Sequence, residues 1–161
     1  DAVLSEDVAE AIQDNIKTTV AANKIAQATF VGGTVVVSPV VSEQLLNIPI
    51  KRLAGTTAYD TSAAVAKYLK DDVTAFGAAT TAGIATGLDY LDALSSCNYT
   101  GTQKVVLLLA DESNETTITG FLTDNGPQGD PAGTYTSAVI FGGTAVVSQQ
   151  VAIDANNALI D

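Results

Sequence analysis

The sequence predicts an α/β fold with a mostly parallel central sheet, and two observations support this class. Val105–Ala110 is an unbroken apolar run between polar segments, which is typical of a strand buried on both faces. From Val8 to Val20 an apolar residue recurs every four positions, which predicts an amphipathic helix. A chain of 161 residues can bury one sizeable core, so we expect residues 1–161 to form a single domain.

The amino-terminal part predicts one helix followed by a hairpin. Ser5 can cap a helix that runs to about Asn23, and acidic residues follow it at the positive end of the helix dipole. Two β-rich runs, Ile25–Val31 and Thr34–Val41, flank a pair of glycines that can both take positive φ. We therefore expect an antiparallel hairpin here, and a connecting segment over Asn47–Gly55.

The central part predicts two further helices. One begins at Thr61 or Ser62, and another covers Ala82–Leu94, where apolar residues share one face. The Asp71-Asp72 pair after the first of these helices is interpreted as solvated surface. Ser95–Gln103 is interpreted as a polar loop that leads to the buried strand.

The carboxyl-terminal part predicts a short helix within Thr116–Leu122 and a mobile loop rich in Gly, Pro and Asp over Thr123–Thr134. Two strands, Tyr135–Phe141 and Thr144–Val151, are expected to close the chain. The stretch from Phe141 to Ser148 is similar to the stretch from Phe30 to Ser38, since both place Gly-Gly-Thr between apolar residues. A hairpin solution used twice is the favoured explanation.

The composition excludes several partners and favours an extracellular setting. The formal net charge of −11 repels nucleic acid and anionic membrane surfaces. The sequence contains no run of 18 apolar residues, so no membrane span is expected. Few residues are charged and many are neutral and polar, and the chain starts at Asp1 rather than at Met. We interpret it as a mature secreted protein.

Enzymatic activity is not expected, because the sequence contains no histidine. This excludes the common nucleophile–histidine pairs and the usual zinc sites. No cofactor is expected. The single cysteine, Cys97, is either a buried small side chain or a link to another chain. Asn98 and Asn114 each begin an Asn-x-Thr pattern in a predicted loop, so we expect an N-linked glycan on one of them.

The order of elements resembles the von Willebrand factor A domain family. A Gly- and Thr-rich segment, Gly77–Gly83, is followed by a predicted helix, and then by a buried strand that ends at Asp111. The resemblance implies a three-layer α/β sandwich and an adhesion site for Mg²⁺ or Ca²⁺. Its ligands would be Asp1, Ser5, Thr80 and Asp111. Val3 stands where the family has an oxygen ligand, so we expect a degenerate site with no strong metal dependence.

The resemblance also implies a first strand that would have to precede Asp1. We expect the segment Thr144–Val151 to fill this place in a neighbouring copy by strand pairing; the alternative is that it folds back and completes its own chain. The residues expected to form that assembly strand are Thr144, Val146, Val147 and Val151. The predicted function is therefore that of a secreted structural or adhesive domain that self-associates into an oligomer or filament.

Two other functions remain open at this point. One is a pilin-like or virion subunit with an unrelated β-rich fold. The other is a soluble carbohydrate- or metal-binding module, whose partners would be glycans or the extracellular matrix.

Overall fold

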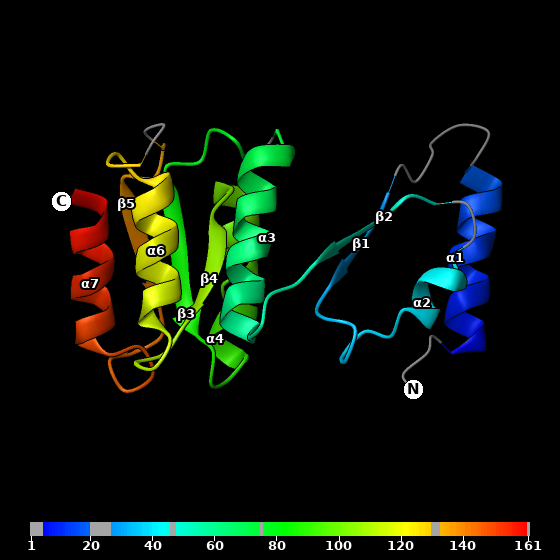
Figure 1. Cartoon of the computed structure of the whole chain (residues 1–161), viewed down its shortest axis with the longest axis horizontal. Helices are drawn as coiled ribbons and strands as arrows, with labels where there is room; N and C mark the ends of the chain where they lie inside the picture. Colours follow the sequence, from blue (N-terminus) through cyan, green and yellow to red (C-terminus); the bar gives the residue numbers. More distant parts are fainter. Residues whose placement is uncertain (1–4, 20–26, 46–47, 75, 130–132, 161) are drawn as a thin grey trace. The chain divides into compact units, whose positions relative to one another are not determined.

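The chain divides into two compact units of parallel strands and helices. Its computed structural model describes residues 5–19, 27–45, 48–74, 76–129 and 133–160 (Figure 1). Unit 1 is Asp1–Thr56 and unit 2 is Thr57–Asp161. Every strand pair in the described residues is parallel, which confirms the predicted α/β class.

Unit 1 contains a small βαβ arrangement. Its elements are α1 (Glu6–Thr19), β1 (Ala28–Val31), α2 (Val40–Glu43) and β2 (Ile50–Leu53). The predicted first helix is confirmed over α1, and the expected part beyond residue 19 lies outside the described residues. β1 and β2 pair in parallel, with Ala28 opposite Ile50 and Val31 opposite Leu53. Parallel strands need a crossover, and the segment that contains α2 provides it.

The hairpin predicted for unit 1 is wrong. Gly32 has a φ of +122° and ends β1, and the amides of Val36 and Val37 both donate to the carbonyl oxygen of Gly33. The chain therefore turns and enters α2 instead of returning as an antiparallel strand. β1 finds its partner in β2, which lies within the segment expected to be a connection. Residues 25–26 of the expected first strand lie outside the described residues.

Unit 2 is a three-stranded parallel sheet with helices on both faces. The strand order is β4-β3-β5, and Ala82 of β3 lies opposite Val106 and Ala138. Its elements are α3 (Ala58–Asp72), β3 (Thr81–Thr86), α4 (Leu91–Ser95), α5 (Cys97–Gln103), β4 (Val106–Ala110), α6 (Glu115–Asn125), β5 (Ser137–Phe141) and α7 (Gln149–Ile160).

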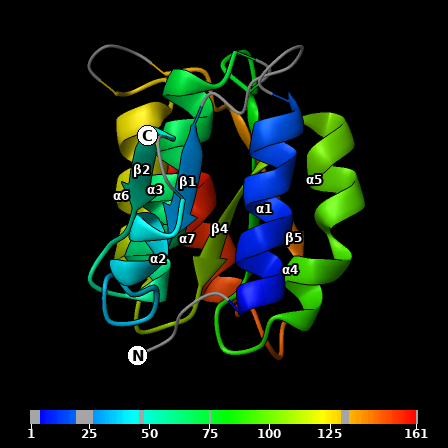
Figure 2. The same ribbon diagram turned by 90° about the vertical axis from the view of Figure 1, so that its right-hand side faces the viewer.

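The main core lies between this sheet and the helices α3, α6 and α7, while α4 and α5 lie on the other side (Figure 2). Alternate residues of the strands point into the core, as the pleat requires. The buried core residues include Ala66, Ala82, Ile84, Val106, Leu108, Ile118, Leu122, Val151, Ala155 and Leu159. On the opposite face, the ring of Tyr99 meets that of Phe141 edge to face, 5.7 Å between centroids.

Several predicted elements in unit 2 are confirmed, and three are wrong. The helices over α3 and α6 and the strands β4 and β5 are where the sequence predicted them. The range predicted as one helix, Ala82–Leu94, instead contains most of β3 and, at its end, the start of α4. The polar loop predicted over Ser95–Gln103 contains α5. The strand predicted over Thr144–Val151 is a turn followed by the start of α7.

The position of β3 explains why the sequence was misinterpreted there. β3 lies between two parallel strands and is buried on both faces, so no alternation of polar and apolar residues marks it. Its side chains are small because its neighbours are close. A Cβ at Gly83 would lie 2.8 Å from a ring carbon of Phe141. The prediction of a central strand buried on both faces is wrong for β4, because only alternate residues of β4 are buried and it lies at the end of the strand order.

The start of α3 is fixed by a reciprocal cap. The amide of Asp60 donates to the hydroxyl oxygen of Thr57 at 3.1 Å, and the amide of Thr57 donates to the carboxylate of Asp60 at 3.0 Å. This capping box satisfies two backbone donors that the helix itself leaves unpaired. It also sets the register of the face that α3 turns toward α6.

We expect Thr57→Ala to lower the free energy of unfolding by about 1 kcal/mol, because the Thr57 hydroxyl no longer accepts from the amide of Asp60 or donates to its carboxylate. Denaturant unfolding followed by circular dichroism measures this change. Thr56→Ala is the matched control, because Thr56 precedes the capping box and is exposed. Equal stability of the Thr57→Ala chain and the wild type would contradict the role given to the cap.

Candidate functional site

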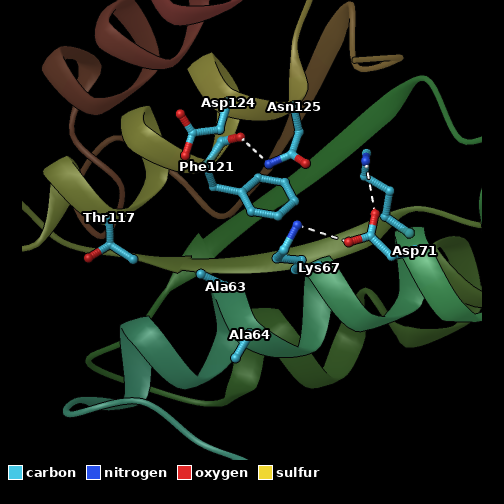
Figure 3. Close-up of a pocket in the computed structure, with 9 residues that line it drawn as sticks. Ala63, Ala64, Lys67, Asp71, Thr117, Phe121, Asp124 and Asn125 are labelled. Atoms are coloured by element: carbon cyan, nitrogen blue, oxygen red, sulfur yellow. Dashed lines mark hydrogen bonds and ion pairs between the residues drawn. The ribbon is translucent and has the colours of Figure 1, made fainter. Parts of the chain in front are cut away.

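A pocket of about 650 Å³ lies between α3 and α6 in unit 2 (Figure 3). Ala63 and Ala64 of α3 leave space at one side because their side chains are small, and Thr117 lies at the opposite side on α6. The residues that line it are Ala63, Ala64, Lys67, Lys70, Asp71, Thr117, Phe121, Asp124 and Asn125.

The α3 side of the pocket carries a three-membered ion-pair cluster. The ammonium group of Lys67 donates to one carboxylate oxygen of Asp71 at 2.9 Å, and that of Lys70 donates to the other at 3.0 Å. Lys67 and Asp71 are four residues apart and so lie on one face of the helix. These hydrogen bonds, that from Lys67 first, hold the pKa of Asp71 below its usual value. Asp71 therefore stays ionised and orients both ammonium groups.

The α6 side of the pocket is partly apolar and rigid. The ring of Phe121 is 7% exposed and belongs to the core, and the side-chain amide of Asn125 donates to the carbonyl oxygen of Phe121 at 2.8 Å. This bond fixes the orientation of the Asn125 amide, which presents its remaining polar atoms next to a buried ring. Asp124 adds one carboxylate at the same end of α6.

The charge of the pocket differs from that of the rest of the chain. Unit 2 contains only three basic residues, Lys67, Lys70 and Lys104, and two of them line the pocket. With Asp71 and Asp124 the pocket is close to neutral, although the whole chain carries a formal charge of −11. Such a pocket suits a ligand with many hydroxyl groups and an isolated anionic group, since long-range repulsion is weakest there.

A buried hydroxyl lies next to this pocket. The ring of Tyr135 is 5.7 Å from that of Phe121, and Tyr135 is fully buried. Its hydroxyl has no hydrogen-bond partner among the residues that the structure describes. Burial, and secondarily the charge of Asp71, raises the pKa of Tyr135 to about 12. The hydroxyl is therefore a neutral donor at physiological pH.

A second pocket, of about 350 Å³, lies beyond the carboxyl end of β4. Asp111 and Glu112 give it a negative charge, so it repels an anionic ligand. Thr144 and Val146 also line it, and they belong to a turn rather than to the assembly strand predicted for them. Val147 and Val151, expected in the same strand, are buried in the core.

The structure does not bring the four expected metal ligands together. Thr80 precedes β3 and Asp111 follows β4, so they lie at opposite ends of a parallel pair, about 20 Å apart along the strands. Ser5 precedes α1 in unit 1, and Asp1 lies outside the described residues. Within the part of the chain that the structure describes, no group of three acidic or cysteine side chains could hold a metal ion.

Asp111 has a structural role that accounts for both of its carboxylate oxygens. The hydroxyl of Tyr59 donates to one of them, and the other accepts from the amides of Ser113 at 2.7 Å and Asn114 at 2.9 Å and from the Asn114 side chain. The bond from Tyr59 is the main reason why the pKa of Asp111 is lowered and that of Tyr59 is raised to about 12. Asp111 thus ties α3 to the turn before α6.

The remaining predicted site residues occupy helices or helix ends. Asn98 is exposed in α5 rather than in a loop, and Asn114 directly precedes α6 with its amide bonded to Asp111. Cys97 is exposed, so the expectation of a buried cysteine is wrong. Sequence reasoning missed Lys67 and Lys70. The sequence shows the spacing of Lys67 and Lys70 from Asp71 on one helix. It does not show which residues of α6 lie across from them.

The comparisons with known proteins identify the family. Residues 52–152 match the family model described as cell wall binding domain 2. The chain belongs to the cell wall binding domain 2 family. It is also 34% identical over 125 residues to N-acetylmuramoyl-L-alanine amidase LytC of Bacillus subtilis, a match that covers 76% of this chain and 22% of LytC.

A solved structure agrees with this fold assignment. Cwp8 from Clostridium difficile matches 82% of this chain with a TM-score of 0.59 and 23% identity. The match covers 20% of Cwp8, so the chain spans only about a fifth of either relative. The amidase activity in the name of LytC therefore describes that protein and is not transferred to this chain.

Membership of this family corrects the expectations drawn from the von Willebrand resemblance. The prediction of an adhesive protein that self-associates into filaments is wrong, and so is the description as a glycoprotein. The two alternatives, a pilin-like or virion subunit and a soluble carbohydrate- or metal-binding module, are not matched either. A cell wall binding domain implies a location outside the cell or at its surface, which agrees with the predicted extracellular setting. Among the described residues, no helix is long and apolar enough to cross a membrane.

We expect Tyr59→Phe to lower the melting temperature at pH 7, because Asp111 loses its main hydrogen-bond donor. The pKa of Asp111 is lowered on folding, so its stabilisation is present above its usual value of 3.8 and is lost as the pH falls through the folded-state pKa. The gap between wild type and variant should therefore narrow below pH 4. Tyr90→Phe, at an exposed tyrosine, is the control. A difference in melting temperature between wild type and Tyr59→Phe that stays the same from pH 7 to below pH 4 would contradict this account.

We expect Tyr135→Phe to raise the free energy of unfolding at pH 8 by about 1 kcal/mol, since a buried hydroxyl without a partner is removed. The gain should increase between pH 10 and pH 12. In that range tyrosine ionises in the unfolded chain, whereas its raised pKa keeps it neutral in the folded one. Denaturant titrations of the wild type and the variant at pH 8 and at pH 12 measure the difference in their free energies of unfolding. A less stable variant would show that the hydroxyl has a bonding partner in solution.

Proposed function

We propose that this chain is a non-enzymatic module that attaches to the glycan polymers of a cell wall through the pocket between α3 and α6. The observation that carries the proposal is the gathering of Lys67 and Lys70 beside Phe121 and Asn125 in a unit that is otherwise acidic. Family membership supports the cell wall as the target.

The pocket offers the groups that sugar polymers with acidic substituents require. Lysine ammonium groups donate charge-assisted hydrogen bonds to phosphate or carboxylate oxygens. The side-chain amide of Asn125 and the hydroxyl of Thr117 can exchange hydrogen bonds with sugar hydroxyls. Asp71 holds both ammonium groups in place before a ligand arrives, which reduces the entropy lost on binding.

Binding, rather than catalysis, is the role that these groups support. The chain contains no histidine, and the carboxylate of Asp71 is already paired with two lysines, which keeps its pKa low. A carboxyl with a lowered pKa is a poor general acid at neutral pH. Attachment to the wall also gives the acidic surface a use, because it limits non-specific adsorption to other anionic surfaces.

We expect the chain to sediment with purified Bacillus subtilis cell walls and the double variant Lys67→Gln/Lys70→Gln to bind them at least ten-fold more weakly. One lost charge-assisted hydrogen bond is worth about 1.5–3 kcal/mol, and ten-fold in affinity corresponds to about 1.4 kcal/mol. Lys104→Gln, outside the pocket, removes one charge as each single pocket substitution does, and it is the control for those single variants. It should remain within about two-fold of the wild type.

Two results would overturn the proposal. Failure of the wild type to bind walls would remove the proposed function. Equal weakening by Lys104→Gln and by either pocket substitution alone would show that net charge, rather than the pocket, controls binding. Walls extracted with acid to remove their anionic polymers separate the two parts of the wall. Loss of binding after extraction identifies the anionic polymer as the ligand, and retained binding identifies the peptidoglycan.

A further inference from the structure

One uncharged polar side chain in the pocket between α3 and α6 is almost fully buried. Asn125, the last residue of α6, is 5% exposed and lines the pocket beside the core residue Phe121 (Figure 3). Burying a side-chain amide costs free energy unless its polar atoms find hydrogen-bond partners. The hydrogen bonds that this amide makes and those that it leaves open therefore indicate what the pocket can bind.

The protein uses a donor of this amide and leaves its acceptor open. The Nδ2 atom of Asn125 donates to the carbonyl oxygen of Phe121 at 2.8 Å. Because a carbonyl oxygen can only accept, this bond fixes which end of the amide is the nitrogen. The Oδ1 atom then points away from that carbonyl, and no donor among the described residues reaches it. The pocket thus contains a carbonyl oxygen that is available to a ligand.

Backbone contacts hold Asn125 in place as well. Its backbone carbonyl oxygen accepts a hydrogen bond from the amide of Tyr135 at 3.2 Å. Gly133 lies so close that a Cβ at this position would be 1.8 Å from the same oxygen, so only glycine fits there. An acceptor that is held in this way loses little conformational entropy when a ligand binds. The Oδ1 atom of Asn125 is therefore pre-organised.

The surroundings of this acceptor combine an apolar surface with positive charge. The ring of Phe121 forms the wall next to Asn125, and Ala63 contributes a methyl group from α3 (Figure 3). Lys67 and Lys70 bring their ammonium groups to the same pocket from α3. A ligand between the two helices therefore meets a hydrogen-bond acceptor, an apolar surface and positive charge.

An acetamido group on a sugar has the features that this arrangement requires. Its N–H can donate to the Oδ1 atom of Asn125, and its methyl group can bury apolar surface against the ring of Phe121. A sugar hydroxyl in the same place could donate, but it would leave the ring without an apolar contact. An anionic substituent on the same sugar would accept charge-assisted hydrogen bonds from the lysines.

We infer that the pocket selects an N-acetylated amino sugar that carries an anionic group, and that Asn125 determines this selectivity. The inference rests on the proposed attachment to wall glycans and adds the class of sugar that the pocket accepts. Lys67 and Lys70 bind the anionic group, whereas Asn125 and Phe121 distinguish the acetamido group from a hydroxyl.

The test compares N-acetylglucosamine 1-phosphate with glucose 1-phosphate as probes, by NMR titration of the full chain. We expect the acetamido sugar to bind about ten-fold more tightly, because only it combines the hydrogen bond to Asn125 with the apolar contact to Phe121. Asn125→Ala should bring the two affinities to within about two-fold of each other. Amide chemical shifts of residues outside the pocket show whether this variant keeps its fold.

Lys67→Gln is the control for the anionic group. It should weaken the binding of both sugars alike and leave the preference for the acetamido sugar unchanged. Equal affinity of the wild type for the two sugars would overturn the inference, and this comparison needs no variant to fold. A preference that persists in folded Asn125→Ala would overturn the role of Asn125. Sedimentation with cell walls tests the proposed function separately, because a chain without sugar selectivity would still bind walls through its lysines.

Discussion

The parallel pairing of β3 with strands on both sides is the constraint on which the rest of unit 2 depends. Parallel neighbours cannot be joined by tight turns, so each connection has to cross a face of the sheet. The chain moves from β3 to β4 and then past β3 to β5, in opposite directions along the sheet. Because such crossovers are right-handed, α4 and α5 cover one face and α6 the other. The strand order therefore sets which face α6 covers, and α3 packs beside α6 to form the pocket.

The proposed binding pocket is held by contacts that lie outside it. Asp111, just after β4, binds the hydroxyl of Tyr59 on α3 and the amides that open α6, so it fixes both helices relative to the sheet. The cap at Thr57 sets where α3 begins. Because Lys67 and Lys70 are two and three turns further along the same helix, their distance from Phe121 depends on these two anchors. A residue predicted to bind metal thus stabilises the frame of a different site.

The same strand, Gly-Gly-Thr turn and helix occurs once in each unit, beside different neighbours. β1 pairs with β2, whereas β5 pairs with β3. In both places a glycine with positive φ, Gly32 or Gly142, directly follows the strand. The local sequence therefore sets the turn, and the strand that pairs beside it is set by the rest of the unit.

The sequence by itself determined the elements whose pattern is local. The apolar run at Val105–Ala110 gave β4, the four-residue period gave α1, and the Gly-Gly-Thr similarity showed that two segments share one solution. The tertiary structure alone decided what these segments pair with. β3 has no alternation of polar and apolar residues that would mark a strand, and its burial between two strands accounts for the extended form. Valines after Gly33 and Gly143 favour strands by propensity, yet they lie in turns whose amides donate to the carbonyl oxygens of these two glycines. The pocket likewise depends on α3 and α6 meeting across more than 40 residues of sequence, a distance that no local pattern encodes.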